Sequence, residues 1–87
     1  MRTEITNGEM DYLMGLIHNI NQKVGCEIVL KPQMQQNGIH FILYRKVNEV
    51  LHPLCTTSPY EFVRFTLICM AKLHGVYYKE PILESYQ

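Results

Sequence analysis

Hydrophobic residues recur at helical spacing in a segment near the start of the chain. The segment opens with the capping-box sequence Thr6-Asn7-Gly8-Glu9, and Gly25 ends it. Between these signals, the residues spaced three or four apart are Met10, Leu13, Met14, Ile17, Ile20 and Val24. This pattern predicts an amphipathic helix in which Leu16 lies off the buried stripe and Gly15 lets another backbone come close.

A second helix is predicted from Ser58 to His74. Ser58-Pro59-Tyr60-Glu61 has capping-box spacing, and Gly75 suits a left-handed residue after the last turn. At 100° per residue, apolar residues cover about two thirds of the helix circumference, namely Phe62, Val63, Thr66, Leu67, Cys69, Met70 and Leu73. We therefore expect this helix to be covered on more than one side and to carry much of the stability.

The segment between the helices has the alternation of β-strands. In Cys26–Lys31, alternate residues from Cys26 point inward, and Pro32 is expected to end the strand. Asn37-Gly38 is a strong turn signal. The best strand, Ile39–Lys46, follows this turn and is apolar on both faces.

A tight reversal at 47–49 leads to a third strand, Val50–Thr56, which should lie at a sheet edge or break at Pro53. If the reversal holds an even number of residues, Val50 and Leu54 lie on the inner face, beside Leu43 and Phe41. In that register His52 points inward too.

Together these elements predict one small α+β domain over residues 1–87. Their order is αβββα, with a three-stranded antiparallel sheet packed on a central C-terminal helix. That helix is expected between the sheet and either the first helix or a second subunit. Residues 76–87 hold three tyrosines and Pro81, which predicts an extended arm laid on the domain or on a neighbour.

Charge and cysteine content narrow the choice of function. Eight basic and eight acidic side chains give a formal charge of zero, so no overall field attracts nucleic acid or an anionic membrane. No apolar run reaches transmembrane length, and the first residues lack the apolar core of a signal peptide. Three widely spaced cysteines favour reduced thiols, so we expect a soluble, cytoplasmic protein.

Candidate chemistry is sparse, and we predict no catalytic, cofactor-binding or metal-binding residues. His52 and Cys55 lie three apart, so in a strand they point to opposite faces and cannot bind one ion, although His40 could approach Cys55. Cys69 and His74 lie five apart on one helix and are turned away from each other. Enzyme activity is therefore not expected.

The element order is similar to that of double-stranded RNA-binding domains. Those domains place lysines at the start of the second helix to grip phosphates, whereas this chain has Ser58-Pro59-Tyr60-Glu61 there. A small nucleic-acid-binding domain acting through the Arg45-Lys46 pair at a hairpin tip is the alternative reading. Nucleic acid is the less expected partner.

Apolar surface remains after one sheet face and one stripe of each helix are buried. The predicted partner-binding residues are Val29, Ile42, Tyr44, Tyr77, Tyr78 and Tyr86. Either the arm covers its own sheet, or this surface binds another protein or a second copy of the chain.

We therefore predict a non-enzymatic protein-binding module, a small regulator or inhibitor that occludes a partner surface. It is similar in size and element order to inhibitor proteins that phages and mobile elements carry, including anti-CRISPR proteins. A homodimer is possible within this interpretation.

Overall fold

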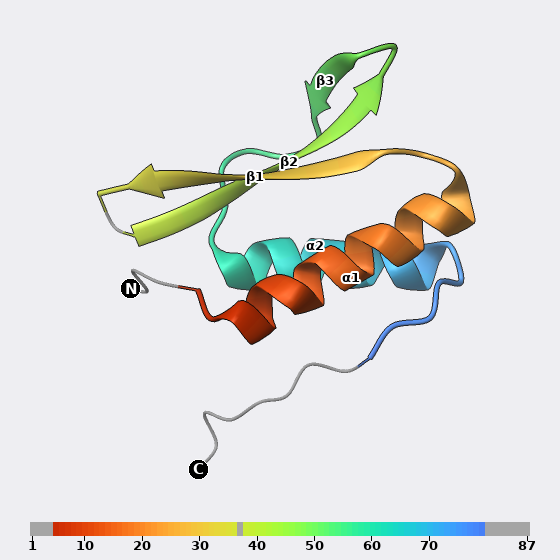
Figure 1. Cartoon of the computed structure of the whole chain (residues 1–87), viewed down its shortest axis with the longest axis horizontal. Helices are drawn as coiled ribbons and strands as arrows, with labels where there is room; N and C mark the ends of the chain where they lie inside the picture. The colour runs from red at the N-terminus through yellow and green to blue at the C-terminus, as the bar shows by residue number, and fades with distance from the viewer. Residues whose placement is uncertain (1–4, 37, 80–87) are drawn as a thin grey trace.

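The computed structural model describes residues 5–36 and 38–79, which form two helices and one three-stranded antiparallel sheet. The elements are α1 (Asn7–Val24), β1 (Ile28–Gln35), β2 (Gly38–Val47), β3 (Val50–Pro53) and α2 (Tyr60–Leu73). Both helices lie on the same face of the sheet, and α2 contacts both α1 and β2 (Figure 1). The predicted α+β class and αβββα order are confirmed.

The ends of α1 are those that the sequence predicts. The Oγ1 atom of Thr6 accepts a hydrogen bond from the backbone N–H of Glu9 at 3.1 Å, and the Glu9 carboxylate accepts one from the N–H of Thr6 at 3.0 Å. Gly25 follows the helix in the left-handed conformation with φ 76°. The capping box and the glycine stop are therefore both confirmed.

The buried face of α1 differs from the predicted stripe. Leu16, expected off the stripe, is buried, whereas Met14 and Val24, expected within it, are exposed. Because α1 packs against both β1 and α2, its inner face turns toward Leu16. Apart from the neighbouring residues and backbone of α1 itself, no heavy atom of the described chain lies within 4 Å of a Cβ placed on Gly15, so the expected close approach of another backbone is wrong.

Pro32 lies inside β1 rather than at its end, so the predicted strand boundary is wrong. β1 is an edge strand, and Pro32 lies opposite Phe41 of β2. The backbone N–H and C=O of Phe41 bond to Ser58 at 2.8 and 2.9 Å, on the side away from β1. The backbone N–H of a residue at position 32 would therefore have no acceptor in β2. Proline, which lacks this N–H, is tolerated there.

The β2–β3 hairpin turns at Asn48 and Glu49, whose φ angles are 51° and 66°. This two-residue turn confirms the tight reversal, and the N–H of Leu54 bonds to the carbonyl of Leu43 at 2.8 Å. Val50, however, pairs with Val47 and does not lie beside Leu43 or Phe41. Moreover, Val50, His52 and Leu54 are exposed rather than buried. β3 is an edge strand and ends at Pro53, as that proline predicts. The hairpin extends beyond the helices, which therefore do not cover it (Figure 1).

The start of α2 is not a capping box. Pro59 occupies the N-cap position and no side chain caps the helix. Ser58 instead donates its hydroxyl to the carbonyl of Thr56 at 2.9 Å, while its backbone pairs with Phe41. Ser58 is thus held by the sheet, and its side chain is turned away from the helix.

The end of α2 follows the prediction. Gly75 is left-handed with φ 67°, and the N–H of Val76 donates to the carbonyl of Ala71 at 2.7 Å. This bond and the burial of Val76 are features of a Schellman motif.

Thr6 and Ser58 provide a matched test of these two helix starts. Thr6→Ala should lower the free energy of unfolding by about 1 kcal/mol, because it removes an N-cap acceptor. Ser58→Ala should change it by less than about 0.5 kcal/mol, because the hydroxyl is exposed and caps nothing. Urea unfolding followed by circular dichroism measures both. Equal losses would show that Ser58 caps α2 in solution.

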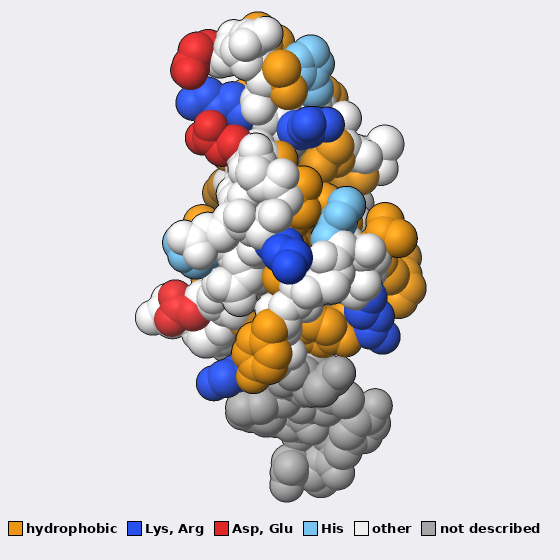
Figure 2. Space-filling view, turned by 90° about the vertical axis from the view of Figure 1, so that its right-hand side faces the viewer, with side chains coloured by type: hydrophobic (Ala, Val, Ile, Leu, Met, Phe, Trp, Pro, Cys, Tyr) orange, Lys and Arg blue, Asp and Glu red, His pale blue; other side chains and the backbone are white. Residues whose placement is uncertain are grey.

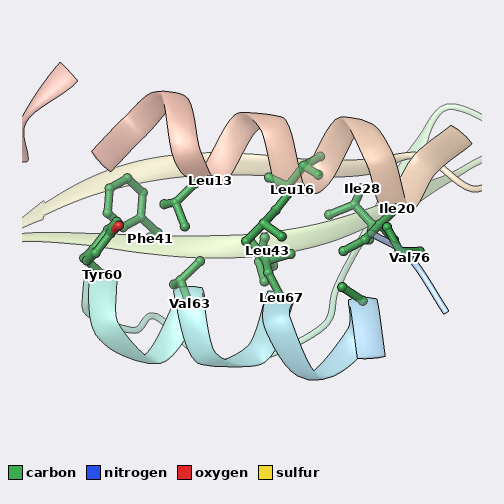
Figure 3. Packing of buried hydrophobic residues seen from close by; sticks show 12 residues of the cluster. Leu13, Leu16, Ile20, Ile28, Phe41, Leu43, Tyr60, Val63, Leu67 and Val76 are labelled. Carbon is green, nitrogen blue, oxygen red and sulfur yellow. The ribbon is translucent and has the colours of Figure 1, made fainter. Parts of the chain in front are cut away.

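The core lies between the two helices and the sheet. Figure 3 shows side chains of α1 and α2 pointing toward each other beside β1 and β2. The fully or nearly fully buried residues are Leu13, Leu16, Ile17, Ile20, Ile28, Phe41, Leu43, Tyr60, Val63, Leu67, Ala71 and Val76. α2 thus provides four of the twelve core residues, all from its inner side.

The side chain of Asn21 joins the last turns of α1 to the start of β1. Its Oδ1 atom accepts a hydrogen bond from the N–H of Ile28 at 2.8 Å, and its Nδ2 atom donates to the carbonyl of Ile28 at 3.3 Å. The thiol of Cys26 also donates to Oδ1, with an S···O distance of 3.6 Å. One half-buried amide therefore fixes the connection between helix and sheet.

Residues 76–79, the described part of the predicted C-terminal arm, run beside α1. The hydroxyl of Tyr12 donates to the carbonyl of Lys79, and Nδ2 of Asn19 donates to the carbonyl of Tyr77 at 3.5 Å. These residues therefore do not cover the far face of the sheet, which was one of the two expectations for the arm. The remainder of the arm, 80–87, lies outside the described residues.

Candidate protein-binding surfaces

A line of apolar side chains runs along the side of α2 that faces away from the core. We define the outer stripe as Phe62, Phe65, Cys69 and Leu73. Phe62 and Phe65 are each 65% exposed, Leu73 is 80% exposed, and Cys69 is also exposed. Their spacing of three or four residues places all four on one side of the helix.

The outer stripe exists because α2 is apolar on two opposite sides. Its buried residues, Tyr60, Val63, Leu67 and Ala71, repeat at the same spacing on the inner side. The sequence therefore contains one stripe for the core and a second stripe that the described part of the chain does not cover. Isolated exposed apolar residues are common, but large ones in line on a rigid helix are typical of an interaction site.

Charged residues of α2 flank one side of the outer stripe. Glu61 and Lys72 are exposed near the two ends of α2. Arg64 is half-buried, and its guanidinium carbon lies 5.5 Å from the centre of the Tyr60 ring. Figure 2 views the end of the molecule where α2 finishes, and there hydrophobic side chains alternate with Lys and His side chains. An apolar line with charged residues along one side resembles the centre and part of the rim of a protein interface.

A second apolar surface lies on the sheet face opposite the helices. We define the outer sheet face by Val29, Ile42 and Tyr44. Val29 of β1 pairs directly with Tyr44 of β2, and Ile42 lies two residues away on the same side. All three side chains are half-buried, and neither α1 nor α2 lies on this face (Figure 1).

The structure brings together three of the six predicted partner-binding residues. Val29, Ile42 and Tyr44 share the outer sheet face, whereas Tyr77 and Tyr78 lie in the segment beside α1. Tyr77 is 76% exposed, and Tyr78 is half-buried against the core. Tyr86 lies outside the described residues.

The four residues of the outer stripe, Phe62, Phe65, Cys69 and Leu73, were absent from the predicted site. The signal for them was the breadth of the apolar arc on α2, which a single packed face cannot bury.

Charges of both signs meet at the tip of the β2–β3 hairpin. The Nζ atom of Lys46 lies 3.2 Å from a carboxylate oxygen of Glu49 and 3.7 Å from one of Glu27. The hydrogen bond from Lys46 to Glu49 and the charges of both carboxylates raise the pKa of Lys46 above its ordinary value. The tip thus combines acidic and basic side chains instead of forming a basic footprint.

No three His, Cys, Asp or Glu side chains within residues 5–36 and 38–79 are placed to hold one metal ion. Neither described helix is long and apolar enough to cross a bilayer.

Comparison with protein-family models, with curated proteins and with solved structures finds no match for this chain. The function is therefore inferred from the surfaces themselves.

Proposed function

We propose that this chain is a non-enzymatic protein-binding module, a small regulator or inhibitor that acts by occupying a surface of its partner. The observation that carries the proposal is the outer stripe, where Phe62, Phe65 and Leu73 expose most of their area. Removal of such side chains from water stabilises a complex by about 25 cal/mol per Å² of apolar surface. A folded helix that presents them already in line loses little conformational entropy on binding.

The outer sheet face supports the same role. It lies on the sheet face that the helices do not cover, so the module has apolar surfaces on two separate sides. One copy could therefore contact two proteins at once, and a regulator that occludes one protein while bound to another needs this arrangement. With a formal charge of zero, recognition depends on these local surfaces rather than on long-range attraction.

A nucleic-acid-binding role through Arg45 and Lys46 is less well supported. Lys46 is paired with Glu27 and Glu49, and the chain has no net positive charge. Binding to a phosphate backbone gains affinity mainly from cations that replace counterions.

We further propose that the protein is an inhibitor that acts in the cytoplasm. Size and element order support an inhibitor of the type that phages and mobile elements carry, such as an anti-CRISPR-like protein. Cys26, Cys55 and Cys69 are free thiols, which suits action in the reducing cytoplasm.

Affinity capture from host lysate, with and without nuclease, tests the proposal. Wild-type protein should retain a nuclease-resistant protein partner, and either Phe65→Glu or Tyr44→Glu should reduce its recovery by about tenfold or more, because a carboxylate would be desolvated in the contact. Met34→Glu is the matched control, since Met34 is 70% exposed and lies at the far end of β1. Capture that disappears with nuclease, or that neither variant weakens, would contradict the proposal.

A further inference from the structure

We infer that the outer stripe binds a second copy of this chain, with the two α2 helices antiparallel about a twofold axis near Leu67. The inference rests on the proposed protein-binding role and names the partner at one of the two surfaces. The outer sheet face of each copy then remains available to a different protein.

The order of residues along the outer stripe suits a twofold contact. Residues 62 and 73 lie at nearly equal distances on either side of position 67, as do residues 65 and 69. In an antiparallel pair, Phe62 of one copy therefore meets Leu73 of the other, and Phe65 meets Cys69. The small Cys69 side chain leaves room for the Phe65 ring, so large and small side chains interdigitate.

Charge also favours the antiparallel orientation. Glu61 and Lys72 lie near opposite ends of α2 and, at 100° per residue, within about 20° of each other around the helix. They therefore flank the same side of the outer stripe. A twofold axis across the stripe places Glu61 of each copy beside Lys72 of the other, whereas a parallel pair keeps like charges at the same end.

The helix dipoles act in the same direction. Each dipole places partial positive charge at the start of α2 and partial negative charge at its end, so antiparallel helices bring unlike ends together.

The sheet and α1 do not lie on the side of α2 that this contact uses. The outer stripe lies opposite the inner side of α2, which packs on α1 and β2. The helix has 14 residues and spans about 21 Å, so the contact lies at the small end of stable interfaces. We therefore expect a dimer with a dissociation constant on the order of 10 μM.

Size-exclusion chromatography with light scattering on the full chain tests this inference. At a concentration on the order of 100 μM, the wild type should have the mass of two chains. Phe65→Glu should raise the dissociation constant by about thirtyfold or more and give a monomer with an unchanged circular dichroism spectrum. Met34→Glu should remain a dimer. A monomeric wild type, or a dimer that neither Phe65→Glu nor Leu73→Glu weakens, would overturn the inference.

Charge reversal tests the orientation of the two helices. Glu61→Lys and Lys72→Glu should each weaken the dimer by about fivefold, and the double variant should return to within about twofold of the wild type. A double variant weaker than both single variants would contradict the antiparallel arrangement.

The capture experiment separates failure of this inference from failure of the proposed function. If the wild type is monomeric but Phe65→Glu abolishes capture of a different protein, the inference is overturned and the protein-binding role stands. If the wild type is monomeric and no variant changes capture, both are contradicted.

Discussion

Leu67→Ala is expected to lower the free energy of unfolding by about 2–5 kcal/mol. Leu67 is fully buried on the side of α2 that packs on α1 and β2. A domain of this size has little stability to spare, so the variant should be largely unfolded near physiological temperature. Urea unfolding followed by circular dichroism measures the loss, at a protein concentration low enough to exclude self-association.

Phe62→Ala is the matched control on the same helix. The broad apolar arc of α2 alone would predict a comparable loss for Phe62, but its side chain is 65% exposed in the structure. Truncation of an exposed side chain should cost less than about 1 kcal/mol. If both variants lost the same free energy, Phe62 would have to be buried in solution and the outer stripe would not be an open surface.

Asn21→Ala is expected to lower the free energy of unfolding by about 1–3 kcal/mol. The substitution leaves the N–H and the carbonyl of Ile28 without their amide partner in a partly buried connection. Thermal and urea unfolding both measure the effect.

Asn19→Ala is the control for Asn21. Asn19 is exposed on the same helix and makes one long hydrogen bond, 3.5 Å to the carbonyl of Tyr77. Its loss should stay below about 0.5 kcal/mol. Equal losses for the two variants would mean that the Asn21 amide does not hold the helix to the sheet.

The sequence predicts helix ends and turns correctly where they depend only on residues next to one another in the chain. The Thr6 capping box, the left-handed Gly25 and Gly75, and the two-residue hairpin turn are all present in the structure. Each depends on the chemistry of a few adjacent residues, which is why the order αβββα is readable without a template.

Features that depend on distant neighbours are those that the sequence does not reveal. Ser58 is a residue type that commonly caps helices, but its backbone pairs with Phe41 in an isolated β-bridge instead. Proline usually ends a strand because it lacks a backbone N–H. At Pro32 that N–H is not needed, because Phe41, the residue opposite it in β2, makes its backbone hydrogen bonds to Ser58. Asn21 gives no sequence signal, because its two hydrogen bonds depend on where β1 begins. Tertiary placement decides all three cases.

The candidate surfaces are predictable to a similar extent. Alternation along β2 indicates that Ile42 and Tyr44 share a face, and the pairing with β1 adds Val29. The broad apolar arc of α2 indicates that a second surface covers this helix in addition to the core. Periodicity alone cannot say whether Val63 or Phe62 faces the core. The structure assigns Val63 to the core and Phe62 to the outer stripe.

A dilution series of amide NMR spectra tests most directly whether α2 presents a protein contact surface. Between about 10 μM and 1 mM, the signals of Phe62, Phe65 and Cys69 should shift with concentration, while that of Met34 stays constant. Signals of α2 that remain unchanged across the series, and also after addition of a captured partner, would contradict the account of the outer stripe as a binding surface.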